Sequence, residues 1–600
     1  MKLSLIIPAV IIFLIFLTVL ELSKNTVLGW ILAAAVLAAF FIVNATVLRS
    51  GAWYFKALAW AAFIALLGAD LWLTQPPIRA VPAADHKNPV ETGIVTVAEG
   101  DLTGVYSEDK AVELYMGVPY AKPPVGELRW KAPQDAEKWQ GVRRCDTYAP
   151  QAMQGRTPAL MGSLVDIFIY KQYQVTLKDN FLAPMSEDCL YLNIWKPAGE
   201  IKDAPVLVFI HGGSLNSGQT WWSEYNGEAL ARRGIVVVNF AYRLGVFGYM
   251  GHPELLDEAG STGNYGLLDQ IKALEWVQKN IGAFGGDKNN VTLAGESAGS
   301  SSVSALCVSP LAKGLFRRAI GESSSVAGVK PYHTFRSLDA ALKGGEDVQK
   351  EFNCASLAEM RAIAAEKLVG TQFTPSAMTV DGYALREQPY LTYERGEQNE
   401  EALLNGYNRN ESVVFSFFYK VDEADLAKNI EPLFGEFSEE AAKLLPIEEV
   451  KAPYKYIVDQ GGSAKGTFDK LLTAAWFSYS HYSWSRLDAK AGIPVWEYYF
   501  TKDNGSMGSN HGGEMPYCYG NLNRHAWLYD ESDFALENAM LTYWENFCRY
   551  GDPNGAGVPE WKKFNEDETK ILELGDNIGM VEDPFLEVYN VIDKYQDTQR

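Results

Sequence analysis

The first 75 residues consist of long apolar runs separated by short polar breaks. Residues 3–20 and 25–48 contain no charged side chain, and each run has roughly the 20 residues that a helix needs to cross a bilayer. A third run, 53–74, is apolar except for Lys56 and Asp70 near its ends, where charged side chains can reach the membrane interface. We predict transmembrane helices over about 3–22, 26–47 and 53–74.

The number of spans decides on which side of the membrane the rest of the chain lies. With the N-terminus inside, Lys2, Arg49 and Lys56 lie inside and the first loop places only Lys24 outside, which is a weak positive-inside bias. Three spans then put the remainder of the chain on the outer or periplasmic side, whereas two would return it to the inside. A cleavable signal peptide is the alternative for the first run, but its apolar part is long and no small-residue cleavage site follows.

The pattern changes after residue 75. Residues 76–91 are proline-rich and lack apolar periodicity, which is typical of an exposed linker. From residue 92 onward, short β-branched or aromatic runs alternate with longer helical patterns, as at 205–213, 234–243, 291–299, 402–408 and 495–500. This alternation favours a mostly parallel sheet covered by helices, so we predict three parts: a membrane region 1–75, a linker 76–91 and one α/β domain 92–600.

Charge and cysteine content narrow the function classes. The chain has 53 basic and 74 acidic side chains, a net charge of −21. Five of the basic and two of the acidic side chains lie in residues 1–80, so the rest of the chain carries a net charge of about −24. This charge has the wrong sign for nucleic-acid binding. It also keeps a large domain away from anionic lipid. Six cysteines without a C-x-x-C pair fit neither a disulfide scaffold nor a thiolate zinc site.

The sharpest chemical signal is the pentapeptide Gly295–Gly299 (GESAG), which follows a strand-like run and precedes small residues suited to a helix start. This G-x-S-x-G pattern in a strand–turn–helix context predicts a nucleophile elbow, which exposes the Ser297 hydroxyl above the sheet. Glycine is needed on both sides because the turn is tight. An ordinary Gly/Ser turn is the alternative, and the flanking pattern disfavours it.

A serine hydroxyl needs a histidine to take its proton and a carboxylate to orient that imidazole. In this kind of fold the chain order is Ser, acid, His. His511 lies in a glycine-rich loop just after the strand-like run 495–500, whereas His481 and His525 lie among aromatic residues and are expected to be packed or surface histidines. Glu411 follows the run 402–408 and precedes His511, although by composition alone it is one acid among 74.

The run 205–210 ends in His211-Gly212-Gly213-Ser214. Consecutive small residues at the end of a strand let backbone N–H groups converge on one point, as in an oxyanion hole. We therefore expect the donors to be the amides of Gly213, Ser214 and Ala298, the residue after the nucleophile. A plain strand-ending turn is the alternative.

With these residues in place, the chain closely resembles the type B carboxylesterase family, which includes para-nitrobenzyl esterases and cholinesterases. The matching segments, in order, are GVPYA at 117–121, PPVGELR at 123–129, SEDCLYLN at 186–193, YRLG at 242–245, GESAG at 295–299 and HGGEMPY at 511–517. The resemblance implies an α/β-hydrolase fold with a mostly parallel central sheet. It also implies a Ser297–His511–Glu411 triad, the oxyanion donors named above, and a structural ion pair between Arg129 and Glu187.

Some positions depart from the family pattern. Ala152 stands where many relatives have a cysteine, which leaves Cys189 either to pair with Cys145 or to remain a free thiol. Counting from the cysteine position, the tryptophan that binds the quaternary ammonium in cholinesterases is replaced by Asp179, which disfavours a choline ester. Three N-terminal spans are also unusual for the family.

The sequence-based hypothesis is a membrane-anchored serine carboxylesterase that needs no metal or organic cofactor. Its expected substrate is an uncharged carboxylic ester with an apolar part, because Leu215 follows the oxyanion motif and aromatic residues make up 12% of the chain. Two alternatives remain: an acyltransferase with the same triad, and a non-catalytic cholinesterase-like binding protein. The segment 160–182 either borders the active-site entrance or is a surface loop, and the physiological ester and the oligomeric state stay open.

Overall fold

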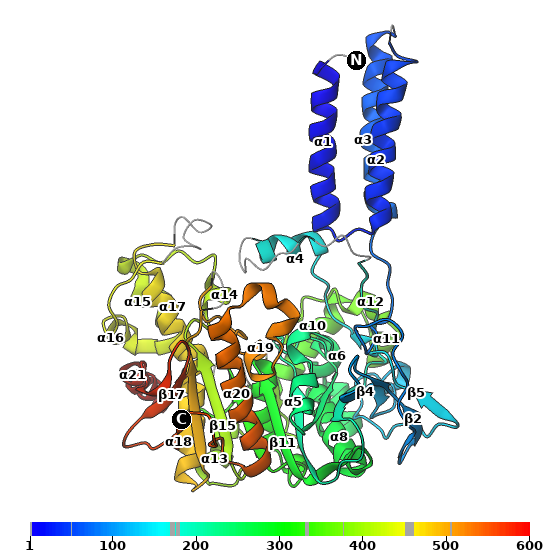
Figure 1. Ribbon diagram of the computed structural model, residues 1–600. Coiled ribbons are helices and arrows are strands. Elements are labelled where there is room, and N and C mark those ends of the chain that lie inside the picture. The colour runs from blue at the N-terminus through cyan, green and yellow to red at the C-terminus, as the bar shows by residue number, and fades with distance from the viewer. Residues whose placement is uncertain are drawn as a thin grey trace. The chain divides into compact units, whose positions relative to one another are not determined.

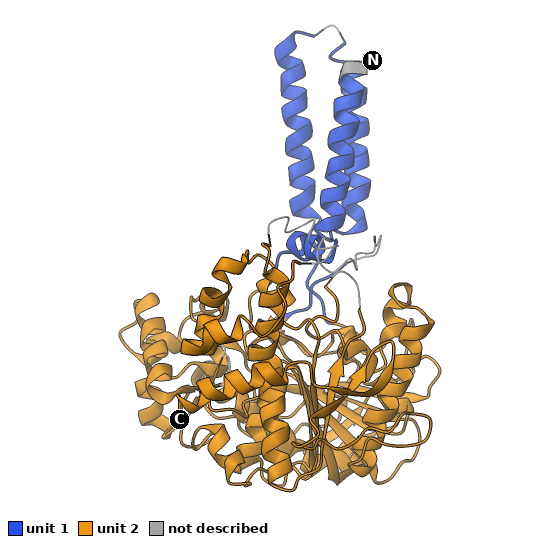
Figure 2. Ribbon diagram, turned by 90° about the vertical axis from the view of Figure 1, so that its left-hand side faces the viewer, with its two compact units in different colours: residues 1–80, 156–184 blue, residues 81–155, 185–600 orange. Residues whose placement is uncertain are grey.

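The computed structural model describes residues 3–49, 51–167, 175, 180–330, 335–375, 377–450, 461–503 and 507–600. The chain divides into two compact units (Figure 2). Unit 1 contains residues 1–80 and 156–184, and unit 2 contains residues 81–155 and 185–600. The domain boundaries expected from the sequence, at 75/76 and 91/92, stay a prediction.

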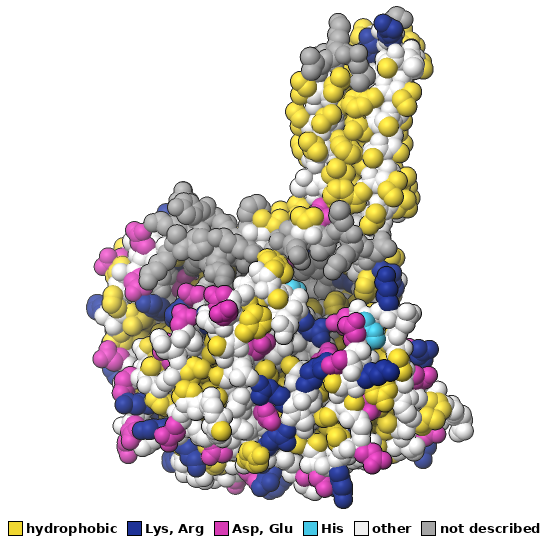
Figure 3. Space-filling model, in the orientation of Figure 1, with side chains coloured by type: hydrophobic (Ala, Val, Ile, Leu, Met, Phe, Trp, Pro, Cys, Tyr) yellow, Lys and Arg dark blue, Asp and Glu magenta, His cyan; other side chains and the backbone are white. Residues whose placement is uncertain are grey.

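Unit 1 is built around three long apolar helices, α1 (Leu3–Leu22), α2 (Val27–Ala45) and α3 (Trp53–Leu73). Their most apolar stretches have mean hydropathies of 2.9, 2.4 and 1.5. Figure 3 shows hydrophobic side chains along their whole length, whereas both signs of charge are interspersed over unit 2. All three helices are long and apolar enough to cross a membrane, which agrees with three predicted spans rather than two.

The turn between α1 and α2 is tied to the end of α3. Asn25 Nδ2 donates to Leu71 O at 2.8 Å and to Thr74 Oγ1 at 2.9 Å. Gly29 lies so close to Thr74 that an added Cβ would meet its hydroxyl at 2.6 Å. Unit 1 also includes α4 (Ala159–Val165), but residues 168–174 and 176–179 of the segment 160–182 lie outside the described residues, so its two interpretations stay open.

Unit 2 contains an 11-stranded sheet. The seven strands from β10 to β17 are parallel to one another, and antiparallel pairs occur only at the two margins. The α/β fold with a mostly parallel sheet is thereby confirmed. In spatial order the strands are β18 (Ile578–Glu582), β17 (Lys570–Leu574), β16 (Val495–Phe500), β15 (Leu403–Asn408), β12 (Arg318–Glu322), β11 (Gly286–Glu296), β9 (Ala204–Ile210), β10 (Val236–Phe240), β8 (Tyr191–Pro197), β4 (Val112–Pro119) and β3 (Val105–Tyr106).

Both faces of the central strands are buried. Along β9, Val206, Val208 and Ile210 pack in one hydrophobic cluster, while Leu207 and Phe209 pack in another, as expected when alternate side chains point to opposite faces of a strand. Helices cover these faces, as expected for a parallel sheet, and several of them flank β11 and β15 in Figure 1. Three of those that contact the sheet are α8 (Tyr265–Asn280), α18 (Tyr479–Lys490) and α20 (Glu531–Tyr550).

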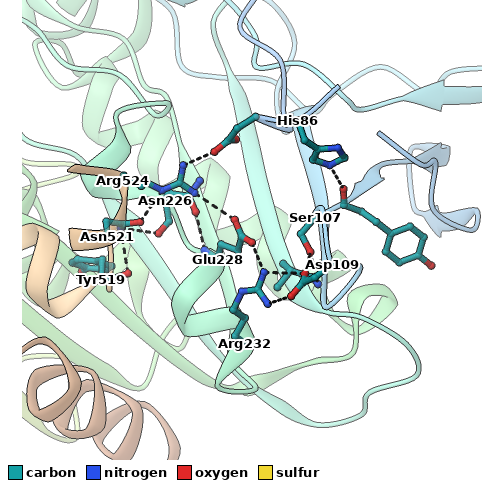
Figure 4. A network of polar contacts seen from close by, with 12 residues as sticks. His86, Ser107, Asp109, Asn226, Glu228, Arg232, Tyr519, Asn521 and Arg524 are labelled. Atoms are coloured by element: carbon teal, nitrogen blue, oxygen red, sulfur yellow. Dashed lines mark hydrogen bonds and ion pairs between the residues drawn. The ribbon is translucent and has the colours of Figure 1, made fainter. Parts of the chain in front are cut away.

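Ion pairs attach the first residues of unit 2 to its helical layer (Figure 4). Arg524 lies between Asp85, at 2.8 Å, and Glu228, at 3.3 Å. Arg232 lies between Glu228, at 2.6 Å, and Asp109, at 2.5 Å. These side chains are partly solvent-exposed, so each pair contributes little, and the network acts mainly by fixing the chain path.

Two features that the resemblance implies concern an ion pair and the cysteines. Arg129 and Glu187 form the expected bidentate ion pair, with N···O distances of 2.7 and 2.5 Å. All six cysteines lie within the described residues and each is a free thiol, including the buried Cys145 and Cys189. Cys189 is therefore a free thiol and does not form a disulfide with Cys145.

Candidate active site

Ser297 occupies the turn between β11 and helix α9 (Ala298–Val308). Its backbone has φ 57° and ψ −126°, a conformation that costs a non-glycine residue on the order of 1–3 kcal/mol. The glycines around it leave no space for a side chain: a Cβ added at Gly299 would lie 2.0 Å from Ile210 O, and one added at Gly295 would lie 2.5 Å from the carbonyl carbon of Gly299. The strand, tight turn and helix of a nucleophile elbow are therefore present.

Glu411 and His511 meet where two loops run side by side. Glu411 lies three residues after the end of β15, and the two loops are joined by a backbone bridge between Asn410 and Asn510. The Glu411 side chain is fully buried; its Oε1 accepts a hydrogen bond from Asn408 N at 2.7 Å, and its Oε2 lies 2.6 Å from His511 Nδ1. A carboxylate in this position orients the imidazole and leaves Nε2 free to face a reacting group.

The other ring nitrogen of His511 faces Glu296, the residue before Ser297. His511 Nε2 lies 3.2 Å from Glu296 Oε1, while the hydroxyl of Ser297 makes no hydrogen bond to any described residue. Burial lowers the pKa of His511, but the carboxylates of Glu296 and Glu411 outweigh this effect and raise the pKa to about 9. Burial also raises the pKa of Glu296, to about 7, against the opposing charge of His511. Unliganded hydrolases often tighten the serine–histidine contact only when substrate binds.

The loop 212–214, the expected oxyanion loop, packs directly against the turn at Ser297. A Cβ added at Gly212 would lie 2.8 Å from Ser297 Cβ, and one added at Gly213, which has φ 105°, would lie 2.1 Å from Ser217 O. Within the described part of the chain, the amide N–H groups of Gly213, Ser214 and Ala298 donate to no acceptor. Unpaired amides beside Ser297 are available to bind an oxyanion.

A second layer of buried polar groups supports the two loops. Ser323 Oγ donates to Glu514 Oε1 at 3.1 Å, and Asn408 Nδ2 donates to the other oxygen of the same carboxyl group. Burial, with the charges of Glu411 and Glu296, raises the pKa of Glu514 to about 8. Asn408 thus links the Glu514 side chain to the backbone turn that holds Glu411.

Aromatic rings form the apolar surroundings of His511. The ring centroids of Phe477 and Phe415 lie 4.9 and 5.2 Å from that of the imidazole. Leu215, which the sequence suggested as an apolar substrate contact, is packed in the core instead, with an exposed fraction of 2%. Phe415 and Phe477 are far apart in sequence and carry no motif, so the sequence offered no sign of either.

The structure brings most of the expected site residues together. It joins Glu411 to His511 and places the oxyanion loop against Ser297, whereas it sets Glu296 rather than the serine hydroxyl beside Nε2. The sequence analysis did not single out Glu296, although its place next to Ser297, the expected nucleophile, was a usable signal. His481 is fully buried and His525 is exposed, as expected of histidines outside the site, and Asp179 lies outside the described residues.

A model of the carboxylesterase family matches residues 91–591. The chain belongs to the carboxylesterase family. The fumonisin B1 esterase of Sphingopyxis macrogoltabida is 32% identical to it over 537 residues, which cover 85% of this chain and 91% of that protein. Carboxylesterase 1C of Rattus norvegicus is 32% identical over 518 residues, covering 81% and 90%.

Solved structures agree with the family assignment. A carboxylesterase of Geobacillus stearothermophilus aligns with a TM-score of 0.69 at 30% identity, covering 84% of this chain and 100% of that one. A para-nitrobenzyl esterase aligns with a TM-score of 0.69 at 29% identity, covering 83% and 99%. The chain is therefore a carboxylic ester hydrolase with the α/β-hydrolase fold, and the apolar helices of unit 1 precede the matched region.

Proposed function

We propose that this carboxylesterase is a membrane-anchored serine esterase with Ser297 as nucleophile, His511 as general base and then acid, and Glu411 as the orienting carboxylate. The observation that carries the proposal is the 2.6 Å contact between Glu411 and His511 Nδ1, on loops beside the strained elbow that holds Ser297. The carboxylate fixes the tautomer in which Nε2 can accept a proton.

In the acylation step, Ser297 Oγ attacks the ester carbonyl carbon while His511 Nε2 takes the hydroxyl proton. The carbonyl oxygen becomes an oxyanion that accepts hydrogen bonds from the amides of Gly213, Ser214 and Ala298. Collapse of this intermediate breaks the ester C–O bond, and the imidazolium protonates the departing alcohol. Water then attacks the acyl-serine with the same general base, which releases the acid and restores Ser297.

The proposed substrate is an uncharged ester with an apolar part. Phe415 and Phe477 beside His511 offer apolar contacts, and the negative charge of unit 2 does not favour an anionic substrate. The relatives named above as carboxylesterases and as a fumonisin B1 esterase are consistent with ester hydrolysis by a triad of this kind.

We place the three helices of unit 1 across a membrane and unit 2 on the outer or periplasmic side, following the weak basic bias of the inner ends. The full-length chain is then expected to remain in the membrane fraction after extraction with alkaline carbonate. Recovery of the intact chain in the soluble fraction would contradict the anchoring.

The test of the enzymatic proposal is hydrolysis of a panel of para-nitrophenyl and choline esters by the full-length chain and by Ser297→Ala. We expect turnover of neutral esters by the native chain, loss of at least about 10³-fold in the variant, and slower turnover of choline esters. No turnover by folded native protein would indicate a binding protein or an enzyme that needs an acyl acceptor other than water, and faster turnover of choline esters would contradict the proposed substrate class.

A further inference from the structure

The segment 412–419, just after Glu411, buries two serines and exposes three aromatic side chains, while Val413 and Phe417 are buried in the usual way. It contains the short helix α14 (Val413–Ser416). Surface helices normally bury apolar side chains and expose polar ones. Here the serines point inward, and three aromatic side chains are exposed to solvent.

The inward face is held by hydrogen bonds to helix α17 (Lys465–Thr473). Ser412 Oγ donates to Asp469 O at 2.7 Å, and Ser416 Oγ donates to Asp469 Oδ1 at 2.6 Å. Lys465, which is fully buried, donates from Nζ to Ser416 Oγ at 3.0 Å. These bonds fix the orientation of the segment, so the aromatic side chains cannot turn inward without leaving buried polar groups unpaired.

The outward face presents Phe415, Phe418 and Tyr419, with exposed fractions of 43%, 85% and 52%. We call these three residues the aromatic patch. A large aromatic side chain stabilises a complex strongly when a partner buries its apolar area. A cluster of such side chains that is exposed and held in place therefore marks an interaction surface.

The aromatic patch reaches the candidate active site through Phe415. The Phe415 ring lies 5.2 Å from the His511 ring and 5.7 Å from that of Phe477. Whatever covers Phe418 and Tyr419 is therefore close to the residues that surround the proposed reacting atoms.

The chain itself indicates the occupant. Residues 74–80 alone join the end of α3 to Val81, where unit 2 begins. Seven extended residues span about 25 Å at most, so a chain anchored through α3 keeps the start of unit 2 within that distance of the membrane. Exposed Phe and Tyr side chains on a rigid support are suited to the interface between headgroups and acyl chains.

The charges beside the patch select the kind of lipid. Lys420 is exposed next to Tyr419, but exposed Asp422, Glu423 and Asp425 follow within six residues. This local excess of negative charge repels anionic headgroups, so a zwitterionic lipid surface is the one that matches the patch.

We propose that the aromatic patch docks on a zwitterionic lipid surface and gives the active site access to esters dissolved in the bilayer. This inference rests on the proposed function for its substrate class. The docking of the patch can be tested without any catalytic readout.

The docking experiment places a bimane probe on the full-length chain in phosphatidylcholine vesicles that contain doxyl-labelled lipid. Phe418→Cys carries the probe at the patch, and Tyr550→Cys, whose native side chain is 72% exposed, is the matched control. Both are made in a Cys354→Ser background because the other five cysteines are buried. We expect at least about twofold stronger quenching at position 418 than at 550, and equal quenching at the two positions would overturn the docking.

The activity experiment compares para-nitrophenyl acetate in solution with para-nitrophenyl palmitate embedded in the same vesicles. In the double variant Phe418→Ser/Tyr419→Ser we expect an unchanged rate on the acetate and a loss of at least about tenfold on the palmitate, while Tyr550→Ser changes neither. Equal rates of the double variant and the native chain on the palmitate would overturn the access route. Absence of acetate hydrolysis by the native chain would instead refute the proposed function. The docking would then be tested by the quenching experiment alone.

Discussion

The two halves of the candidate site are held in place in different ways. On the histidine side, side chains do the positioning: Glu411, Glu296 and Glu514 surround His511, and hydrogen bonds from Asn408 hold two of these carboxyl groups. On the serine side the backbone does the positioning, through a strained φ of 57° at Ser297 and through glycines that have no space for a Cβ.

This contrast teaches which kind of change each half tolerates. A side-chain substitution on the histidine side alters charge and protonation in a low-dielectric pocket, where such effects are large. On the serine side, apart from the hydroxyl of Ser297 itself, side-chain identity is expected to matter only where an added atom would collide, since the other proposed catalytic groups there are backbone amides. Four substitutions test this division, in order of decreasing effect on activity.

Glu411→Gln tests the histidine side most severely. The amide keeps the shape of the carboxylate but cannot stabilise the imidazolium or hold the tautomer with Nε2 unprotonated. We expect kcat for a neutral para-nitrophenyl ester to fall by about 10³- to 10⁴-fold with little change in thermal unfolding. Retention of more than a tenth of the native kcat would show that Glu411 does not orient His511.

Gly213→Ala tests the serine side. The new methyl group would lie 2.1 Å from Ser217 O on a backbone with φ 105°, so the loop must shift and displace an oxyanion donor. We expect a loss of about 10²- to 10³-fold in kcat. A native rate in the folded variant would remove Gly213 from the oxyanion hole.

Glu296→Gln separates charge from position at His511 Nε2. Removing the carboxylate 3.2 Å away takes away one of the charges that raise the pKa of His511 to about 9. Because the base acts when neutral, activity falls as pH falls through this pKa, and the variant should keep its activity to lower pH. The measurement is kcat/KM of both proteins from pH 5 to 10, and superimposable acid limbs would contradict the proposed charge effect.

Ser214→Ala is the matched control for the backbone half. Ser214 has φ 53°, a conformation that is as unfavourable for alanine as for serine, so the substitution leaves the backbone strain unchanged. Only the backbone amide of Ser214 is expected to donate a hydrogen bond to the oxyanion. We expect kcat/KM within about threefold of the native value. A loss comparable to that of Gly213→Ala would mean that the Ser214 hydroxyl takes part in binding.

The same contrast explains how far the sequence could predict the molecule. Local patterns were sufficient for β9, β11, β15 and β16, for the three apolar helices, and for the elbow, since each depends on neighbours within a few residues. The pairing of Glu411 with His511 needed the family resemblance, because a hydrogen bond between residues 100 positions apart leaves no local pattern.

Other features had no local signal at all. The approach of Glu296 to His511, the rings of Phe415 and Phe477 around the imidazole, and the inward turn of Ser412 and Ser416 all depend on how distant segments pack. The inward orientation of the two serines depends on the buried pair of Lys465 and Asp469 beneath them.

The central claim is that Ser297 is a nucleophile activated by His511, and covalent trapping tests it most directly. The full-length chain and the variants Ser297→Ala and Ser214→Ala are treated with a fluorophosphonate, digested, and mapped by mass spectrometry. We expect one adduct, on Ser297, in the native chain and in Ser214→Ala, and none in Ser297→Ala. An adduct that persists in folded Ser297→Ala, or that maps to another serine in the native chain, would contradict it.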